Sequence, residues 1–299
     1  MSRKEIFKFK DRMIKGISPE GYFKMSVVKT TDVVQSAKER HNLSPINTLL
    51  LGRTLTASLL LASELKGEER IRLRLEGDGP VGMVLAEANR TGEVRGYVQH
   101  PLANIDYGKD EIGAGLGAGT LSVSKMLYNE AEPRISTIEL YHGDISTDVA
   151  HYLTQSEQIH SALLLHQTFK PDADVRQAGG LLLQRLPDAP EDVTDQLHER
   201  MLHFDSIATL LDEGVYIDEI MERAAHPYQV KELARQPVHF FCRCSRDRFV
   251  TALSMLNYRE LDEMKGERQE MVCHFCNESY TILPDEIGKL AENAQARMN

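Results

Sequence analysis

Four cysteines, all in the last fifth of this 299-residue chain, constrain its fold more than any other feature of the sequence. One residue separates the first two, in Cys242-Arg243-Cys244, and two residues separate the last two, in Cys273-His274-Phe275-Cys276. The 28 residues from Ser245 to Val272 lie between the pairs. Two close pairs of thiolates supply the four soft ligands that zinc prefers in a closed, structural site. The spacing therefore predicts one Zn²⁺ held by Cys242, Cys244, Cys273 and Cys276.

The cysteine pattern alone leaves three other kinds of site open. A plain zinc ribbon would use the thiolates only as a structural staple, and an iron site would use the same ligands. The third is a thiol-disulfide oxidoreductase, although its Cys-x-x-Cys motif usually opens a helix in a thioredoxin-like fold. Cysteines separated by one residue close only a cramped disulfide ring, and strained disulfides are usually labile and regulatory. This favours a redox-responsive site, with His239 and His274 outside the ligand set.

Metal binding is expected to decide whether the C-terminal domain, residues 237–299, is folded. A four-thiolate zinc site contributes on the order of 10–16 kcal/mol of apparent binding free energy, comparable with the stability of a whole domain. Loss of the metal should therefore unfold this domain. Apolar residues between the cysteine pairs predict one helix that ends at Gly266 and returns the chain to the metal: Val250, Leu253, Leu256, Leu261 and Met264.

The charge balance and the N-terminal sequence narrow the classes of protein further. A formal net charge of −10 opposes a polyanion such as DNA or RNA, which argues against a zinc-ribbon nucleic-acid-binding protein. Residues 1–13 carry charge throughout, and the longest apolar stretch, Leu49 to Leu61, is interrupted by Gly52, Arg53 and Thr54. We therefore predict no signal peptide, no membrane span, and a reducing, cytoplasmic location.

Residues 1–186 are predicted to form an α+β core domain. Helices are expected over Thr31–His41 and from Ser44-Pro45 to about Leu65. From Arg70 to Gly77, alternation of leucine or isoleucine with charged residues indicates a half-buried strand. A run of further strands with a single helix between them completes the pattern: Gly82–Ala88, Val94–Val98, Thr120–Lys125, Ile135–Leu140, a helix over Thr147–Gln155, and Ser161–Thr168.

Residues 187–236 are predicted to be a helical, metastable linker region. Pro187 and Pro190 mark its start, and a short second helix fits Tyr216 to Ala225, before His226-Pro227. One side of this region is acidic, and the opposite side carries an apolar stripe. The stripe cannot be buried unless a neighbouring element packs against it. An ordinary packed helix pair remains the alternative to a switch element. The stripe recurs at spacings of three and four: Val193, Leu197, Met201, Phe204, Ile207, Ala208 and Leu211.

Two short patterns that also occur in enzymes are weak evidence for catalysis in this chain. Gly113, Gly115 and Ala118 loosely match a dinucleotide-binding pattern, but a strand follows where a helix is required. Ser122 and Lys125 have the Ser-x-x-Lys spacing of acylating enzymes, yet they lie in a strand-like run. No phosphate-binding P-loop is present. The chain is therefore interpreted as a binding module and not as an enzyme.

Nearly the whole chain resembles the 33-kDa heat-shock proteins, which are redox-regulated holdase chaperones of bacteria. The order of the two cysteine pairs and the length of their spacer carry the resemblance. Met126 is a small departure, since an acidic residue is expected there. The N-terminal part adds four motifs: Glu76-Gly77-Asp78-Gly79-Pro80, Arg95-Gly96-Tyr97-Val98, Ser156-Glu157-Gln158 and Ala178-Gly179-Gly180-Leu181.

The resemblance implies an ATP-independent chaperone that is inactive when reduced and zinc-bound. Oxidation by peroxide or hypochlorite, especially with heat, would pair Cys242 with Cys244 and Cys273 with Cys276 and expel the zinc. The C-terminal domain would then unfold, and the linker region would be destabilised. Apolar surface, including the stripe from Val193 to Leu211, would become available to unfolding client proteins. The family also dimerises on activation.

Overall fold

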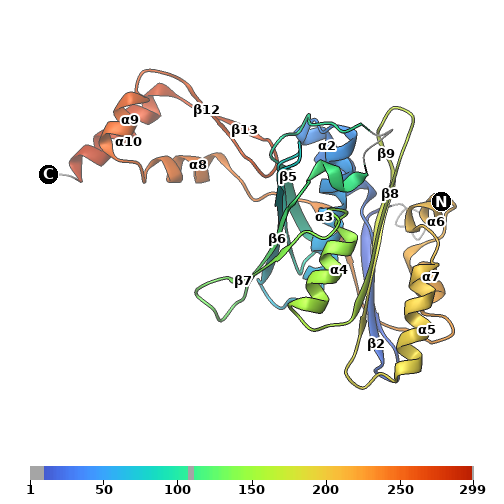
Figure 1. Cartoon of the computed structure of the whole chain (residues 1–299). Helices are drawn as coiled ribbons and strands as arrows, with labels where there is room; N and C mark the ends of the chain where they lie inside the picture. The colour runs from blue at the N-terminus through green and yellow to red at the C-terminus, as the bar shows by residue number, and fades with distance from the viewer. Residues whose placement is uncertain (1–9, 107–110, 298–299) are drawn as a thin grey trace, which may run out of the picture. The chain divides into compact units, whose positions relative to one another are not determined.

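The computed structural model describes residues 10–106 and 111–297, and the chain divides after Phe241 into two compact units. The first unit is a layered arrangement of two β-sheets and several helices (Figure 1). The second is a small unit of helices and one hairpin. Residues 1–9, on which the prediction of no signal peptide largely rests, lie outside the described residues. The division of the first unit into a core domain over 1–186 and a linker region over 187–236 stays a prediction.

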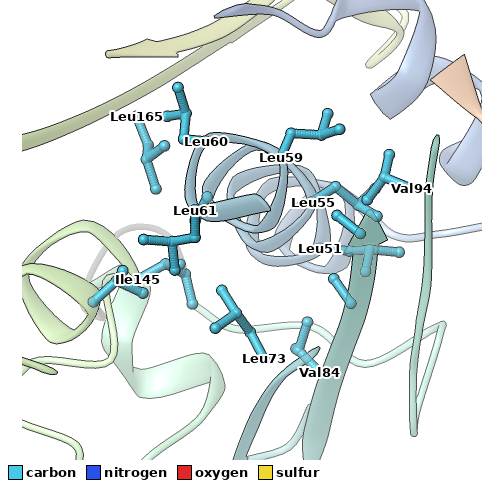
Figure 2. Packing of buried hydrophobic residues seen from close by; sticks show 14 of the residues in the cluster. Leu51, Leu55, Leu59, Leu60, Leu61, Leu73, Val84, Val94, Ile145 and Leu165 are labelled. Atoms are coloured by element: carbon cyan, nitrogen blue, oxygen red, sulfur yellow. The ribbon is translucent and has the colours of Figure 1, made fainter. Parts of the chain in front are cut away.

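Helix α3 (Pro45–Ala62) lies at the centre of the first unit, with apolar side chains on nearly every face. Within the described residues it is the one helix long and apolar enough to cross a membrane, but 83% of it is buried inside the unit. Figure 2 shows Leu55, Leu60 and Leu61 pointing outward from α3 in different directions. Burying each leucine contributes about 1.5–3 kcal/mol, so α3 is the main stabilising element of the core.

Sheet B covers one side of α3. Its order is β11-β5-β4-β3-β6-β7, antiparallel except for the parallel β11–β5 pair. Leu73 and Val84 face α3 (Figure 2), whereas Arg72 and Arg95 pair with Glu87 on the outer face. The strands are β3 (Arg70–Gly77), β4 (Met83–Asn89), β5 (Glu93–Val98), β6 (Gly119–Met126), β7 (Arg134–Glu139) and β11 (His239–Phe240).

Sheet A covers the opposite side of α3, and all its strands are antiparallel in the order β10-β1-β2-β9-β8. A Cβ on Gly180 would lie 2.8 Å from Thr56 Cγ2 of α3, so glycine is needed for this close approach. That contact explains the Ala178-Gly179-Gly180-Leu181 motif in physical terms. The strands are β1 (Arg12–Ile17), β2 (Phe23–Lys29), β8 (Ser161–Phe169), β9 (Val175–Arg185) and β10 (Lys231–Pro237).

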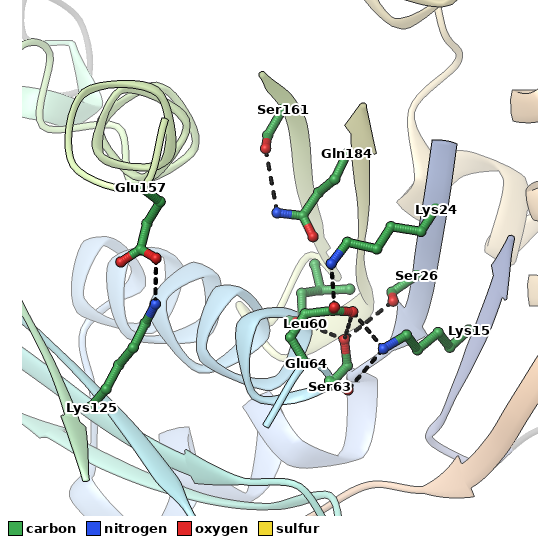
Figure 3. A network of polar contacts seen from close by, with 10 residues as sticks. All are labelled: Lys15, Lys24, Ser26, Leu60, Ser63, Glu64, Lys125, Glu157, Ser161 and Gln184. Carbon is green, nitrogen blue, oxygen red and sulfur yellow. Dashed lines mark hydrogen bonds and ion pairs between the residues drawn. The ribbon is translucent and has the colours of Figure 1, made fainter. Parts of the chain in front are cut away.

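Polar contacts join the C-terminal end of α3 to sheet A (Figure 3). Lys15 donates to the Ser63 carbonyl at 3.2 Å and, with Lys24, pairs with Glu64. The lysines lie at the negative end of the helix dipole, where cations are favourable. Burial alone would raise the pKa of Glu64, but hydrogen bonds from both lysines outweigh it and hold the pKa below its usual range.

The two patterns that also occur in enzymes make structural contacts in the first unit. Lys125 lies in β6, as the strand prediction required, and its ammonium group pairs with Glu157 at 2.7 Å (Figure 3). The glycine-rich segment around the short helix η1 (Ile112–Gly115) packs against the Glu76–Pro80 loop. A Cβ on Gly77 would lie 2.2 Å from the Leu116 carbonyl oxygen, so that loop needs its glycine to make the contact.

Three short helices cover the face of sheet A that points away from α3: α5 (Glu191–Leu202), α6 (Ile207–Asp212) and α7 (Ile217–Ala225). Among its described residues the first unit also contains helices α2 (Thr31–His41) and α4 (Ser146–Gln155). The layers therefore run sheet B, α3, sheet A, and the α5–α7 helices (Figure 1).

One continuous segment, residues 231–240, completes an edge of both sheets. Strand β10 pairs with β1 at the edge of sheet A, and β11 pairs with β5 at the edge of sheet B. Val238 between them is buried, and its N–H donates to the Asp11 carbonyl at 3.3 Å. This segment is the last part of the first unit before Cys242.

The second unit, Cys242–Asn299, has its own small core. Leu253, Ile282 and Ile287 form its buried apolar cluster, with partly buried neighbours such as Val250 and Leu290. Its elements are α8 (Arg246–Leu253), α9 (Tyr258–Glu263), β12 (Gln269–Val272), β13 (Ser279–Ile282) and α10 (Pro284–Ala296).

The predicted α+β fold class is confirmed, and the predicted helices and strands of residues 31–168 are present within a few residues of their expected ends. Two element predictions were wrong. The region 190–236 is not helical throughout, because residues 231–237 form strand β10; its charged, exposed side chains give no apolar alternation. The single helix predicted between the cysteine pairs is two helices, since Asn257 starts α9 with a capping box to Glu260.

Candidate metal centre

The four cysteines come together from two loops of the second unit. Cys242 and Cys244 lie in the extended segment before α8, and Cys273 and Cys276 lie in the turn between β12 and β13. All four sulfurs lie within 4.8 Å of one another. Cys242 Sγ is 3.8 Å from Cys273 Sγ, and Cys244 Sγ is 3.3 Å from Cys276 Sγ. The cysteines are free thiols, since none is disulfide-bonded.

Local backbone hydrogen bonds shape the second loop into a tight turn. The N–H groups of Cys276 and Asn277 both donate to the Cys273 carbonyl, at 3.3 and 2.7 Å. Cys273 N–H in turn donates to the Glu278 carbonyl at 2.9 Å, where the β12–β13 hairpin begins. Asn277 has a φ of 56°, a left-handed conformation that asparagine tolerates better than most residues. The turn therefore points both thiols to the same side.

The first loop is anchored to the same hairpin through α8. Ser245 caps α8 by accepting a hydrogen bond from Arg248 N–H at 3.4 Å. In the first turn of α8, Arg246 donates to the Thr281 carbonyl of β13 at 3.1 Å and forms an ion pair with Glu286. These contacts bring the segment that carries Cys242 and Cys244 next to the hairpin that carries the other pair.

The sulfur geometry fits a tetrahedral dication. Four sulfurs at about 2.3 Å from a central zinc ion lie about 3.8 Å apart, close to the separations found here. Burial raises the pKa values of the Cys273 and Cys276 thiols, so without a cation both thiols remain protonated at neutral pH. A bound dication would stabilise the thiolates instead. The four cysteines can thus hold a metal ion, and the donor set is the one that zinc prefers.

The two histidines near the motifs are not part of this sulfur cluster. Among the described residues, the candidate metal-binding group consists of the four cysteines alone. His239 lies in β11 of the first unit, where its ring meets that of Phe241 edge-on at 6.0 Å. His274 is exposed in the turn between the second pair of cysteines. The structure therefore places neither histidine ring among the clustered sulfurs.

Tyr280 belongs to the site, although no sequence pattern marks it as a site residue. Its hydroxyl lies 3.2 Å from Cys244 Sγ and 3.3 Å from the Cys244 carbonyl oxygen. The contact with Cys244 raises the pKa of the phenol, with burial as a further cause, so the hydroxyl keeps its proton. An aromatic residue four positions after a cysteine gives no signal by itself; only the hairpin fold brings the two groups together.

The apolar stripe predicted for the linker region is covered in this structure. Its buried members pack on the outer face of sheet A, against Phe23, Met25 and Leu183. The neighbour that the stripe requires is therefore a sheet of the first unit. Two of its strands, β2 and β9, have no apolar alternation that would predict them from the sequence. The buried stripe residues are Val193, Leu197, Met201, Ile207, Ala208 and Leu211, and Phe204 is partly buried beside them.

Comparison with known proteins gives one consistent family. A family model described as Hsp33 protein matches residues 11–283. The 33 kDa chaperonin of Desulforamulus reducens is 39% identical over 292 residues, covering 96% of this chain and 99% of that protein. The 33 kDa chaperonin of Bacillus subtilis is 34% identical over 288 residues, covering 94% and 98%. The crystal structure of the Thermotoga maritima 33 kDa chaperonin aligns with a TM-score of 0.89 at 29% identity, covering 96% and 99%.

Proposed function

Because this chain belongs to the Hsp33 family, we propose that it is a redox-regulated, ATP-independent holdase whose switch is the four-cysteine cluster. Members of the family are named chaperonins, so the chain is a chaperone that binds unfolded client proteins, and not an enzyme. The regulation is our proposal. The observation that supports it most is the convergence of four free thiols from two loops to within 4.8 Å.

In the proposed resting state, Cys242, Cys244, Cys273 and Cys276 hold one Zn²⁺ and the chaperone is inactive. When bound, the cation keeps the sulfurs as thiolates and ties the first loop to the β12–β13 hairpin. In the proposed active state, Cys242 is paired with Cys244 and Cys273 with Cys276. Each pair gives two electrons to a peroxide, which is reduced to water, and the sulfurs no longer bind zinc.

Loss of zinc would then act on the first unit through the chain that precedes Cys242. Strand β11 contributes only two residues to sheet B, and Phe241 adds one further hydrogen bond, from its N–H to the Val94 carbonyl at 2.8 Å. So short a strand separates readily once the residues after it are disordered. Strand β10 immediately precedes β11 in the chain, and Arg235 of β10 forms an ion pair with Asp218 of α7.

The proposed client-binding surface is the apolar interface between the α5–α7 helices and sheet A. Its stripe residues are buried in the present state, so they cannot bind a client until the helices separate from the sheet. Separation would expose two apolar faces at once, one on α5 and α6 and one on β2 and β9. Large apolar surfaces of this kind are what unfolding proteins bind. We also propose a cytoplasmic location, a homodimer on activation, and no nucleic-acid partner.

The proposal is tested with reduced, zinc-loaded protein that is treated with peroxide at elevated temperature. Zinc release is followed with a chromogenic chelator, and chaperone activity by light scattering of a heat-unfolding client. We expect oxidation to release one zinc ion per chain and to suppress client aggregation, and a reductant with added zinc to reverse both. Peptide mapping by mass spectrometry identifies the disulfides.

Two results would contradict the proposal. If zinc stays bound and protection is unchanged by peroxide, the four cysteines are a structural staple only. If a disulfide substrate is turned over catalytically, the protein acts as an oxidoreductase. A nucleic-acid role would appear as salt-sensitive binding to DNA or RNA.

A further inference from the structure

Tyr280 lies outside the sulfur cluster, and its side chain contacts one of the four sulfurs. Its hydroxyl has two acceptors within reach on the same residue, Cys244 Sγ at 3.2 Å and the Cys244 carbonyl oxygen at 3.3 Å. The hydroxyl has a single proton to donate. Which acceptor receives it therefore depends on the charge on the sulfur.

The position of the tyrosine ring is fixed from two sides. In the β12–β13 hairpin, Tyr280 lies opposite Met271. Phe249 of α8 packs on the ring, with centroids 5.3 Å apart and planes at 38°. Because α8 begins two residues after Cys244, the helix that orients the ring is also the one that follows the cysteine. The hydroxyl is thus held in place before any metal binds.

A hydrogen bond to a thiolate changes what that sulfur can do. Hydrogen bonds to charged acceptors are stronger than those to neutral ones, so the hydroxyl stabilises the anionic sulfur preferentially.

Oxidation removes the negative charge of the sulfur. The thiolate attacks one oxygen of hydrogen peroxide, an S–O bond forms, the O–O bond breaks, and hydroxide leaves. A second thiolate then displaces hydroxide from the sulfenic acid to give the disulfide. A group that stabilises the starting thiolate more than the transition state slows the first step.

We propose that Tyr280 is a positioning residue of the redox switch, which donates its hydroxyl proton to Cys244 Sγ in the reduced state and thereby restrains both oxidation of that sulfur and loss of zinc. The inference rests on the proposed function, because it concerns the threshold of that switch. Groups that hydrogen-bond to metal ligands typically change metal affinity 10–100-fold when removed. In the oxidised state the sulfur is uncharged, and the Cys244 carbonyl becomes the better acceptor.

The test is Tyr280→Phe, which removes only the hydroxyl oxygen, in the full-length, reduced, zinc-loaded protein. With peroxide in excess, zinc release should be about tenfold faster than in the unsubstituted protein. A competing chelator without oxidant should show zinc affinity weakened by a factor of about ten. The matched control is Tyr258→Phe in α9 of the same unit, whose hydroxyl contacts Asp262 at 3.4 Å and no sulfur. It should match the unsubstituted protein in both measurements.

Phe249→Leu provides a second variant that keeps the hydroxyl and loosens the ring. It should lie between Tyr280→Phe and the unsubstituted protein in both measurements. If Tyr280→Phe matches the unsubstituted protein in zinc affinity and in release rate, the inference is overturned, while peroxide-driven release from the unsubstituted protein still supports the proposed function. If peroxide releases no zinc from any variant, the proposed function fails, and the chelator measurement alone still decides whether Tyr280 positions a ligand.

Discussion

His166 shows how a single ring can hold a helix in place. It lies half-buried in β8, and its Nδ1 accepts a hydrogen bond from the backbone N–H of Ile207, the first residue of α6, at 3.1 Å. Burial, together with the charge of Arg53, lowers the pKa of His166 from its usual value of 6.5. The neutral ring is the form that can accept this bond, so protonation removes the acceptor and adds a positive charge at a helix N-terminus.

The first prediction concerns pH. Since the folded protein lowers the pKa of His166, the stability due to its neutral form is present above pH 6.5 and is lost as the pH falls through the lower, folded-state pKa. In His166→Asn, an amide oxygen can accept the Ile207 N–H and does not titrate. Below pH 6.5, the free energy of unfolding should therefore fall more steeply in the unsubstituted protein than in His166→Asn. Chemical denaturation over a pH series measures both slopes, and equal slopes would contradict the assignment.

The sequence predicted the metal site of the four cysteines, but it predicted no role for Tyr280 or His166. Closely spaced cysteines indicate a metal or redox site, because structural disulfides are rare in a reducing compartment. A tyrosine or a histidine has many uses, and both of these act on partners that lie far away in the sequence. Their roles depend on strand register: Tyr280 opposite Met271 in the hairpin, and His166 opposite Gly179 in sheet A.

Among the elements, the α5–α7 helices carry the proposed regulation. Helix α5 has one apolar face, and Leu197 on that face is 3% exposed, whereas Leu202 on the same helix is 62% exposed. The helix is too short to be stable by itself and depends on its packing against sheet A. A substitution in this interface can therefore weaken the packing of α5 on sheet A without altering the four cysteines.

The second prediction is that Leu197→Ala loosens α5 in reduced, zinc-loaded protein. Truncating a buried leucine costs about 2–5 kcal/mol, so amide exchange in α5 should be faster, and partial suppression of client aggregation should appear without oxidant. Leu202→Ala is the control, and it should change stability by no more than about 0.5 kcal/mol. Fast exchange without any gain in client protection would remove this interface from the proposed client-binding surface.

Elements with regular apolar patterns were the ones that the sequence predicted best. Strand β3 alternates, and α3 is apolar over a long run that begins at a proline, so both were predicted close to their observed ends. Strands β1, β2 and β9 were missed. Strand β2 is buried on both faces and has no clean alternation, and exposed β10 is held by backbone pairing with β1. Such pairing is a long-range property that a local pattern does not contain.

The molecule as a whole combines a unit with a large apolar core and a unit with a small one. In the first unit α3 and two sheets share one extensive apolar cluster, whereas the second buries few apolar side chains, such as Leu253, Ile282 and Ile287. A core of that size seldom stabilises a domain without a metal or disulfides. The two units should therefore respond very differently to a chelator.

The third prediction concerns removal of zinc from reduced protein. Amides in β12, β13 and α10 should lose protection from hydrogen exchange, because a zinc ion bound by the four cysteines is expected to supply most of the folding free energy of the second unit. Amides in α3 and β3 should remain protected, since their core contains no metal ligand. Adding zinc back should restore the protection. If the second unit stays protected without metal, its small apolar cluster is sufficient for folding.

The segment that completes both sheet edges has a consequence for how the protein is made. Residues 231–240 supply β10 and β11, which cover β1 in sheet A and β5 in sheet B. On the ribosome they are the last part of the first unit to emerge. At about 5–20 residues per second, roughly 7 to 28 seconds separate the synthesis of β5 from that of its partner β11. Throughout that interval two strands expose unpaired backbone groups of the kind that promote aggregation. During its own translation, a protein that protects other chains is thus itself a nascent chain in need of protection.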